Sequence, residues 1–329
     1  MRVLFLGGTG NISTSCTRAA IAAGMEVFHF NRGNAKGRSP DEVQTIIGDI
    51  RNPDEAGRLL AGMRFDVVVD WIAFTPEHIA TDLKLFRGSV GHYVFISSAS
   101  VYHRPVRHHV ITESTPAHNP FWKYSRDKIA CEQLLWQAYE QDGFPATIVR
   151  PSHTYSDGWF PSTFGHDYTV PSRMINGRPI VVHGDGSSLW TITHTDDFAK
   201  GFTGLLGSPQ TIGEVFHITS DEQLTWDEIH RTVGSALGVE PEIVHVPSEV
   251  IARFDPAVGP GLLGDKQSSV AFDNSKIKRY VPGYTATIPF HEGMRRSAAR
   301  AAADPLSRTV NTDTDALIDR LVAAIRSIC

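Results

Sequence analysis

The chain has 329 residues, of which 41% are hydrophobic and 20% are charged, and its formal net charge is −5 at pH 7. This composition is typical of a globular protein large enough for two lobes, and the negative charge argues against nucleic acid or an anionic membrane as a partner. No apolar stretch reaches the length of a transmembrane helix, and the N-terminus lacks the pattern of a signal peptide. Cys16, Cys131 and Cys329 form no CxxC and share no metal-ligand spacing, so we expect reduced thiols, a cytoplasmic protein and no metal site.

Short apolar strands alternate with helical segments in the first half of the chain. We expect strands at 3–6, 26–30, 43–47, 66–70, 93–96 and 146–149, and helices at 11–23, 53–63, 76–86 and 121–141. This alternation implies a parallel sheet covered on both faces, and right-handed crossovers make such a sheet doubly wound. The predicted fold class is therefore α/β, a doubly wound Rossmann sheet with a smaller C-terminal substrate-binding domain.

The pattern loosens after Pro151. Residues 159–186 are rich in Gly, Pro, His and aromatic residues and are predicted to form a lid or pocket segment. A short apolar run at 215–218 could return to the edge of the sheet. Thr225-Trp226-Asp227-Glu228 is a capping box that should start a helix ending near Gly238. The remaining segments are predicted as a mobile loop at 254–266 and two closing helices at 290–303 and 313–328.

A glycine-rich segment, Gly7-Gly8-Thr9-Gly10-Asn11-Ile12-Ser13, connects the first expected strand to the first expected helix. In this context it predicts a dinucleotide site, because small residues let the backbone approach a pyrophosphate at the helix N-terminus. A glycine-rich turn without a ligand is the alternative. Ser13 stands at the third glycine position of the usual fingerprint, where a small side chain still permits close packing. The expected cofactor contacts are Gly7, Thr9, Gly10, Asn11 and Ile12.

The residues after the second strand bear on the type of dinucleotide. An acidic residue there would accept a hydrogen bond from the ribose 2′-hydroxyl of NAD. This chain has Asn31-Arg32 instead, and Arg32 could pair with a 2′-phosphate, helped by Lys36 or Arg38. We therefore predict NADP in preference to NAD, with a solvated loop arginine as the alternative.

Asp49-Ile50 follows the third expected strand. A carboxylate at this place can accept a hydrogen bond from the adenine amino group. We therefore predict that Asp49 and Ile50 hold the adenine, with a plain helix cap as the alternative.

Tyr124 and Lys128 lie four residues apart on one expected helix and therefore point the same way. The Lys128 ammonium would lower the pKa of Tyr124 and favour a phenolate near neutral pH, and it could also hold the nicotinamide ribose. Ser98 follows the fifth expected strand, at the sheet edge where doubly wound folds bind ligands. Its hydroxyl could bond the substrate oxygen that Tyr124 protonates or deprotonates, although Ser97 and Ser100 offer the same chemistry.

With these motifs, the chain resembles the extended short-chain dehydrogenase/reductase family, the NAD(P)-dependent epimerase/dehydratase group. The matching motifs, spread over most of residues 1–290, are Gly7–Gly10, Gly48-Asp49, Ser97-Ser98-Ala99-Ser100-Val101-Tyr102, Tyr124-x-x-x-Lys128, Arg150-Pro151-Ser152, Gly184-Asp185-Gly186 and His194-Thr195-Asp196-Asp197. The resemblance implies that Ser98, Tyr124 and Lys128 are catalytic. It also places Ala73, Pro151 and Ser152 against the cofactor, with Tyr124 and Lys128. The implied domains are an NAD(P)-binding domain of residues 1–152 plus about 191–220, and a substrate domain of residues 153–190 plus 221–329.

Three positions depart from the family pattern. Family epimerases commonly carry an arginine shortly after Gly-Asp-Gly that binds the sugar-nucleotide diphosphate, and Trp190 stands there in this chain. His153 replaces the asparagine that such enzymes place after the sixth strand, and Asn31-Arg32 replaces the acidic residue of NAD-retaining epimerases. Because an arginine that meets two phosphates contributes strongly to recognition, a nucleotide-diphosphate substrate is in doubt.

The substrate contacts are predicted from the same region. The candidate substrate residues are Ser100, His153 and Trp190. One of His153, His166 and His183 could serve as a second acid or base, with His153 the best placed. Trp159, Phe160 and Trp190 could stack on a sugar or aromatic substrate, with ordinary core packing as the alternative.

The expected function is an NAD(P)-dependent oxidoreductase or epimerase that exchanges a hydride with a secondary alcohol or ketone of a sugar-like substrate, nucleotide sugars included. One alternative is an NADPH-dependent reductase of a non-nucleotide carbonyl compound. Another is a non-catalytic relative that senses dinucleotides or binds RNA, which the intact Tyr124 and Lys128 and the negative charge disfavour. The expected partners are a small-molecule substrate and, by family analogy, a second copy of the chain.

Overall fold

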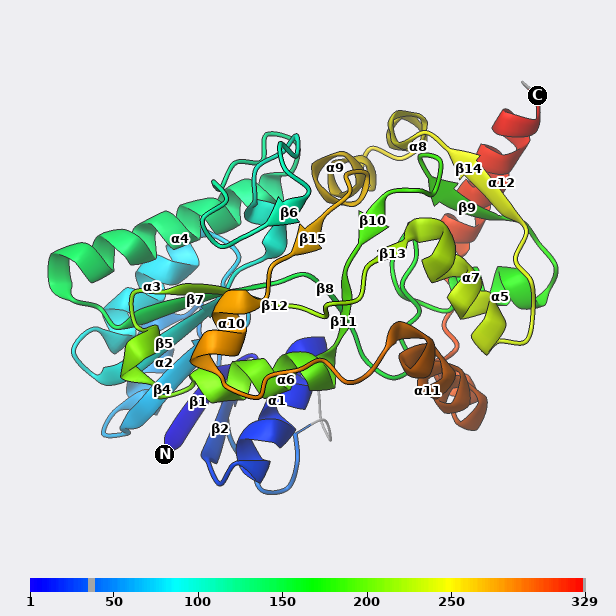
Figure 1. Cartoon of the computed structure of the whole chain (residues 1–329). Coiled ribbons are helices and arrows are strands. Elements are labelled where there is room, and N and C mark those ends of the chain that lie inside the picture. Colours follow the sequence, from blue (N-terminus) through cyan, green and yellow to red (C-terminus); the bar gives the residue numbers. More distant parts are fainter. Residues whose placement is uncertain (35–38, 328–329) are drawn as a thin grey trace.

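The computed structural model describes residues 1–34 and 39–327, and its centre is a seven-stranded parallel sheet (Figure 1). In spatial order its strands are β12 (Val215–Ile218), β7 (Ala146–Pro151), β5 (Val90–Ile96), β4 (Phe65–Asp70), β1 (Arg2–Leu6), β2 (Glu26–Asn31) and β3 (Gln44–Ile47). The strand order runs outward from β1 to β3 and then resumes at β4 on the other side of β1. The point between β1 and β4 is therefore the topological switch point, where doubly wound sheets bind ligands. The predicted Rossmann fold class is confirmed.

Helices cover both faces of this sheet. One face is covered by α1 (Asn11–Ala22), α6 (Thr195–Leu205) and α10 (Ser275–Tyr280), and the other by α2 (Pro53–Leu60), α3 (Pro76–Phe86) and α4 (Lys123–Asp142). Strand β1 shows why both faces must be covered. Val3 and Phe5 belong to the core on the α1 side, whereas Leu4 and Leu6 belong to the core on the α4 side. A short run that is apolar at every position is thus buried on both sides.

A second group of elements packs around its own hydrophobic core, to the right of the sheet in Figure 1. It contains β8 (His153–Tyr155), α5 (Thr169–Ile175), β9 (Ile180–His183), β10 (Leu189–Trp190), β11 (Ile192–His194), β13 (Leu224–Thr225), α7 (Trp226–Ala236), β14 (Ile243–Val246), α8 (Ser248–Phe254), α11 (Phe290–Ala303) and α12 (Thr312–Arg326). The capping box forms as predicted, because the Thr225 hydroxyl accepts from the Glu228 N–H at 3.1 Å and the Glu228 carboxylate accepts from the Thr225 N–H at 2.7 Å. The predicted closing helices are also present, although residue 328 lies outside the described part.

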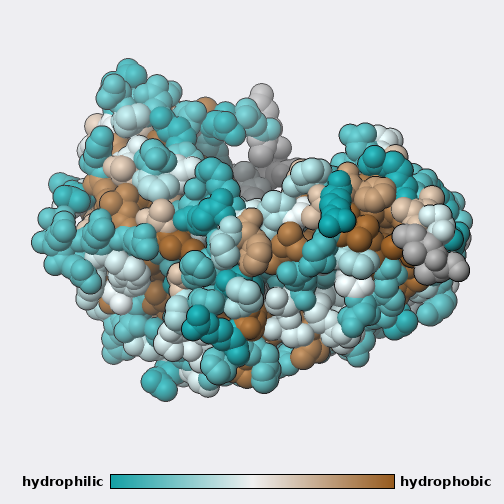
Figure 2. Space-filling model, turned by 90° about the horizontal axis from the view of Figure 1, so that it is seen from above, coloured by the Kyte–Doolittle hydropathy of each residue, from teal (hydrophilic) through white to brown (hydrophobic). Residues whose placement is uncertain are grey.

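Shorter elements complete the described part of the chain. They are β6 (Val110–Ile111), which pairs with β15 (Ala271–Phe272), α9 (Gly259–Gly261), the π-helix Leu262–Lys266, and three 3₁₀ turns at Ala99–Val101, Pro209–Thr211 and Pro305–Ser307. Seen from above, the molecular surface is hollowed between the two groups (Figure 2). Among the described residues, no helix combines the length and apolar character needed to cross a lipid bilayer.

The prediction of a mobile loop at 254–266 is wrong, because most of this segment is helical. Its glycines and its two prolines suggested turns, but Pro260 lies in the first turn of α9, where proline is tolerated. Gly264 is small for a different reason. A Cβ there would lie 3.0 Å from the Asn119 Oδ1 and 3.1 Å from the Trp122 Cβ, so the glycine allows close packing on the start of α4.

The two cysteines that the structure describes, Cys16 and Cys131, are buried and unpaired. Cys16 lies in α1 and Cys131 in α4, in the cores on opposite faces of the sheet. Cys329 lies outside the described residues.

Candidate active site

The glycine-rich turn lies between β1 and α1 and leaves no room for larger side chains. Gly7 has a φ of +86°, which favours glycine, and a Cβ on Gly8 would clash with the His29 ring of the adjacent strand. Ser13 has a role that its position in the fingerprint did not reveal. Its hydroxyl accepts from the Gly10 N–H at 2.8 Å and donates to the Gly7 carbonyl at 3.0 Å, so it closes the turn on itself.

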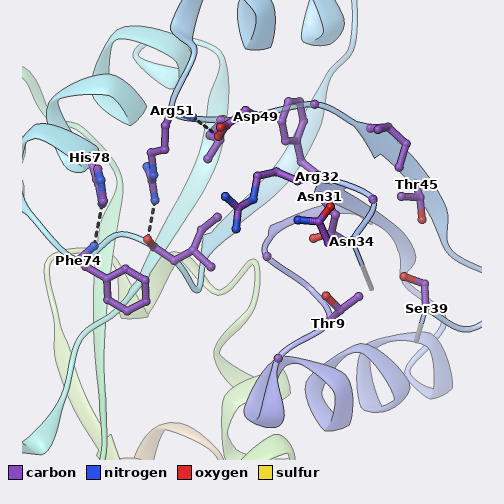
Figure 3. Close-up of a pocket in the computed structure, with 18 residues that line it drawn as sticks. Thr9, Asn31, Arg32, Asn34, Ser39, Thr45, Asp49, Arg51, Phe74 and His78 are labelled. Atoms are coloured by element: carbon purple, nitrogen blue, oxygen red, sulfur yellow. Dashed lines mark hydrogen bonds between the residues drawn. The ribbon is translucent and has the colours of Figure 1, made fainter. Parts of the chain in front are cut away.

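A cavity of about 840 Å³ opens in front of this turn (Figure 3). It lies at the switch point of the sheet and has the size expected for a small-molecule or cofactor site. Seven of the predicted cofactor residues line it, namely Gly7, Thr9, Gly10, Asn31, Arg32, Asp49 and Ile50. The turn and the ends of β2 and β3 therefore contribute to one surface, as the sequence motifs predicted.

Arg32 extends its guanidinium into this cavity, on the side of Asp49 and Arg51 (Figure 3). Asp49 is the only acidic residue among the described residues that line the cavity. Asp49 already accepts a hydrogen bond from the Arg51 N–H at 2.9 Å. The end of β2 thus presents a cation and an amide where an NAD site would present a carboxylate. Lys36 and Arg38, the other predicted phosphate contacts, lie outside the described residues.

Arg51 is a cavity residue that sequence reasoning missed. Its Nη2 donates to the Ile72 carbonyl at 2.6 Å, which ties the end of β3 to the loop after β4. Phe74 and His78 also line the cavity, and the Phe74 N–H donates to the His78 ring at 3.0 Å. The Gly48-Asp49 motif drew attention to the carboxylate, and the adjacent arginine was a signal that could have been used.

Other predicted cofactor residues are not among those that line this cavity. Asn11 starts α1 and its side chain donates to the Thr154 carbonyl at 3.4 Å, while Ile12 packs into the core on the α1 side. Pro151 ends β7, and the Ser152 hydroxyl donates to the Thr191 carbonyl at 3.2 Å. These contacts connect the N-terminus of α1 to the first residues of the second group.

The serines after β5 form a short hydrogen-bonded chain. The Ser98 and Ser100 hydroxyls are 2.9 Å apart, and the Ser125 hydroxyl of α4 donates to Ser100 at 2.8 Å. Ser100 is only 2% exposed and Ser97 only 3%, whereas Ser98 is partly exposed. Of Ser97, Ser98 and Ser100, Ser98 is therefore the most accessible to a ligand, and the buried Ser100 hydroxyl forms a hydrogen bond with it.

Tyr124 and Lys128 lie on one face of α4, with the Lys128 Nζ 5.8 Å from the centre of the Tyr124 ring. The predicted lowering of the Tyr124 pKa is not observed. Burial raises the pKa of Tyr124 to about 12, and the hydrogen bond with Ser98 opposes this rise. The Lys128 Nζ donates instead to the carbonyls of Ala73 and Ile96, each at 2.7 Å. Burial also lowers the pKa of Lys128 itself to about 8.

Two buried contacts fix the helix that carries these residues. The Asn119 amide donates to the Ser100 carbonyl at 2.8 Å and to the Gly264 carbonyl at 2.7 Å. Its oxygen accepts from the N–H groups of Phe121 and Trp122, which directly precede α4. Farther along α4, Glu132 forms a two-point ion pair with Arg150 of β7, at 2.9 and 2.6 Å. The helix is therefore attached to the serine segment, to the π-helix and to the sheet.

The predicted substrate residues lie in different surroundings. His153 begins β8; burial lowers its pKa to about 3, and its Nε2 has no hydrogen-bond partner among the described residues. Trp190 is 3% exposed and packs on Trp226 at 5.7 Å between ring centres, in the core of the second group. His183 is held by the Thr163 hydroxyl and by the Lys266 carbonyl.

Two stacking candidates also have packing partners. Phe160 is 1% exposed, and Trp159 stacks on His166 at 3.5 Å between ring centres. Core packing therefore accounts for the burial of Phe160 and Trp190, which was the alternative in both cases.

The π-helix supplies residues that the sequence did not point to. Asp265 accepts from the buried Arg104 guanidinium at 3.2 Å. The Lys266 Nζ donates to the carbonyls of Ser162 and Thr163, at 3.0 and 2.9 Å. The segment thus connects the loop after β5 to the second group. Reading 254–266 as a loop concealed this connection.

A parallel doubly wound sheet with a glycine-rich turn and a large cavity at the switch point defines a Rossmann dinucleotide-binding protein. Residues 3–219 match the model of the NAD dependent epimerase/dehydratase family. The chain belongs to this family, and the relatives that it matches are of the extended short-chain dehydrogenase/reductase type. It is therefore an enzyme of this NAD-dependent group.

The chain is similar to several characterised proteins. It is 30% identical to 2′-dehydrokanamycin reductase of Streptomyces kanamyceticus over 286 residues, which cover 86% of this chain and 80% of that protein. It is 26% identical to chloroplast stem-loop binding protein of 41 kDa b of Arabidopsis thaliana over 74% of this chain and 65% of that protein. UDP-glucuronic acid 4-epimerase of Bacillus cereus, solved with UDP-glucuronic acid and NAD, has the same fold, with a TM-score of 0.74, 20% identity and coverage of 92% of this chain and 99% of that chain.

Proposed function

We propose that this enzyme is an NADPH-dependent reductase of a ketone on a sugar-like substrate that lacks a nucleotide diphosphate. The observation that carries the proposal is Arg32 at the end of β2, with its guanidinium in the cofactor cavity. A 2′-phosphate would find a cation there and no repelling carboxylate at the same strand end. A reductase must exchange its oxidised cofactor after each turnover, and NADPH is the reduced form that Arg32 would favour.

The residues present fit a dinucleotide. Gly7 and Gly8 leave the backbone open where a Cβ would clash with neighbouring side chains, and the N-terminus of α1 faces the same space. Asp49 and Ile50 would hold the adenine, and Lys128, beside Ala73, would hold the nicotinamide ribose. When bound, the reduced nicotinamide would supply the hydride.

Tyr124 would act as the acid in the reductive direction. Burial raises its pKa to about 12, so the phenol carries a proton at neutral pH that it could donate to a carbonyl oxygen that becomes an alcohol. Ser98, the most accessible of the serines after β5, would orient that oxygen.

The substrate class is supported by a relative and by one substitution. The relative with 30% identity is named for the reduction of a dehydro-aminoglycoside, which is a sugar ketone without a nucleotide. In this chain Trp190 stands at the position that family resemblance assigns to a diphosphate-binding arginine, and its indole is buried against Trp226. We therefore expect the enzyme to oxidise NADPH when it is given keto-sugars or keto-aminoglycosides, and not when it is given nucleotide 4-keto-sugars.

The cofactor preference is tested by parallel titrations with NADPH and NADH. Arg32→Ala should weaken NADPH binding by roughly 10- to 100-fold, about 1.4–2.8 kcal/mol, with little effect on NADH. Arg58→Ala removes an exposed arginine of α2 that does not line the cavity and serves as the charge-matched control. Tighter binding of NADH by the unaltered enzyme, or equal losses in both variants, would contradict the proposal.

The reaction type is tested by denaturing the purified enzyme and identifying any released dinucleotide by mass spectrometry. A reductase should release little, because it exchanges its cofactor. Stoichiometric NAD would show an enzyme that recycles its cofactor internally and would favour an epimerase.

The expectation that nucleic acid is not a partner is tested separately, by titrating the folded, purified enzyme with RNA at physiological salt.

A further inference from the structure

A buried carboxylate lies at the end of β4, directly beneath the predicted catalytic lysine. Asp70 is 0% exposed, and its Oδ1 accepts from the Ile72 N–H at 2.6 Å and from the Ala73 N–H at 2.8 Å. The carbonyl of Ala73 in turn accepts from the Lys128 Nζ at 2.7 Å. Asp70 therefore fixes the backbone turn that holds Lys128, at the switch point of the sheet.

A second carboxylate lies next to the first. Asp82 of α3 is 1% exposed and accepts from the Tyr93 hydroxyl at 2.7 Å. The Arg51 guanidinium lies 3.8 Å from the Asp70 Oδ2 and 3.9 Å from the Asp82 Oδ1. These two oxygens are buried, and neither has a hydrogen-bond partner among the described residues when both acids are ionised.

One shared proton accounts for this arrangement. Two adjacent buried carboxylates cannot both be ionised without a large electrostatic cost. Burial and the neighbouring Asp70 raise the pKa of Asp82 well above its usual range, so Asp82 is the protonated member. A protonated Asp82 can donate to Asp70, which leaves Asp70 ionised between the Arg51 guanidinium and the Lys128 ammonium.

The other groups around Lys128 do not supply its counter-charge. On α4 itself, burial raises the pKa values of Cys131 and Tyr124 to about 12, so both side chains are neutral. Glu132, on the same helix, is already paired with Arg150. The groups that face it from other elements are Asp70, Arg51 and His78. The rings of Phe74 and Phe95, 4.9 and 4.7 Å from the Nζ, add no full charge.

We propose that Asp70 is a positioning residue for Lys128. The ionised Asp70 carboxylate holds the turn at residues 72 and 73 and keeps the lysine ammonium charged, and Asp82 is its protonated hydrogen-bond partner. This inference rests on the proposed function only in giving Lys128 a role toward the cofactor. It explains why a buried acidic residue ends the central strand β4. It also links Arg51 in the cofactor cavity to Lys128 at the catalytic end through one carboxylate.

The decisive experiment compares two isosteric variants, Asp70→Asn and Asp82→Asn, by direct titration of Lys128. The lysines are labelled with ¹³C at the ε-carbon, and the Lys128 resonance is assigned by its absence from Lys128→Arg. In the unaltered enzyme Lys128 should titrate near pH 8. Asp70→Asn should move this midpoint to lower pH by about one unit or more, whereas Asp82→Asn should leave it nearly unchanged, because only the first variant removes a charge.

A second measurement keeps the inference testable if Asp70→Asn does not fold. Carboxyl ¹³C spectra of the unaltered enzyme at pH 7 should show one protonated aspartate, and that signal should be absent from Asp82→Asn. Equal midpoints for Lys128 in all folded variants, equal displacement by both substitutions, or no protonated aspartate at pH 7 would each overturn the inference.

An activity readout separates a positioning role from a purely structural one. At pH 8, Asp70→Asn should lower kcat/KM by about 5-fold or more, and the loss should shrink at pH 6, where Lys128 regains its proton. A structural defect would lower the rate equally at both values. The lysine titration uses no cofactor or substrate, so a failure of the NADPH proposal would not affect it, and a failure of the titration would not affect the cofactor preference.

Discussion

At the scale of single residues, the site is governed by burial more than by the spacing of charges. The Tyr124 and Lys128 pair was predicted from a four-residue spacing, and the structure places both side chains on one face of α4. Their ionisation is set by the low-dielectric surroundings, which raise the pKa of Tyr124 to about 12 and lower that of Lys128 to about 8. Both shifts favour the neutral form of the group concerned.

Removal of the tyrosine hydroxyl tests its role as proton donor. Tyr124→Phe should reduce turnover by roughly 100-fold or more, because the carbonyl oxygen loses its acid, while the affinity for NADPH stays within about twofold. Steady-state kinetics and a cofactor titration on the same preparation provide the comparison. A variant with full activity would remove Tyr124 from the mechanism.

At the scale of secondary-structure elements, helix α4 matters because it carries both Tyr124, the proposed acid, and Lys128. Its N-terminal end is held by Asn119, which is 1% exposed and bonded to the serine segment and the π-helix together. Its middle is held by the Glu132–Arg150 pair, whose side chains are 4% and 6% exposed. The first contact fixes Tyr124 relative to Ser98, and the second fixes the helix relative to the sheet.

The buried ion pair should contribute to stability in an asymmetric way. Glu132→Gln leaves the Arg150 guanidinium buried without a counter-charge and should lower the free energy of unfolding by about 3–5 kcal/mol. Asp127→Asn, which breaks the exposed pair with Lys123 on the same helix, should change it by less than about 1 kcal/mol. Urea denaturation measures the free energy of unfolding of both variants. If both lose less than about 1 kcal/mol, the buried pair does not stabilise the fold in the expected way.

Asn119 should affect turnover as well as stability. Asn119→Ala removes two buried donors and should cost about 1–3 kcal/mol, with a clear fall in kcat and little change in NADPH affinity, because Tyr124 and Ser98 are no longer fixed together. Asn311→Ala is a matched control. Asn311 also accepts from two backbone N–H groups, at 3.0 Å each, but it caps the distant helix α12. An equal fall in kcat in both variants would indicate general destabilisation.

At the scale of the whole molecule, the buried histidines determine the response to acid. Burial lowers the pKa values of five of them to about 3 or 4: His29, His92, His153, His183 and His230. These side chains are neutral in the folded state, whereas in the unfolded state each binds a proton below about pH 6.5. The unfolded state therefore binds more protons as the pH falls.

The free energy of unfolding should decrease as the pH falls from about 6.5 toward about 4, by up to about 1.4 kcal/mol per pH unit for each such histidine. Urea denaturation at several pH values between 7.5 and 5 measures this slope. His230→Gln should make the slope shallower, and His291→Gln, which alters an exposed histidine of α11, should leave it unchanged. A stability that is constant between pH 7 and 5 would contradict this prediction.

The arrangement of the whole chain leaves two predictions open to experiment. We propose that residues 1–152 plus about 191–220 form the NAD(P)-binding domain and that the rest forms the substrate domain, and limited proteolysis with and without NADPH tests this division. The predicted homodimer is tested by sedimentation of the purified protein.

The sheet, the glycine-rich turn and the cavity-lining ends of β2 and β3 could be predicted from the amino-acid sequence, because they depend on local patterns. An apolar run at 3–6 must be buried on both faces, and a glycine with positive φ is a local requirement. The Tyr124 and Lys128 spacing on a helix is local as well.

Other features depend on contacts between residues that are distant in the chain, and these required the three-dimensional structure. It distinguished Ser98 from its neighbours by exposure, and it converted the glycine-rich segment before Lys266 into a helix by packing it on α4. It also brought together Asp70 of β4, Asp82 of α3 and Arg51 of the loop after β3. The ionisation of these buried groups follows from the dielectric and the charges around them, and neither can be read from the order of residues.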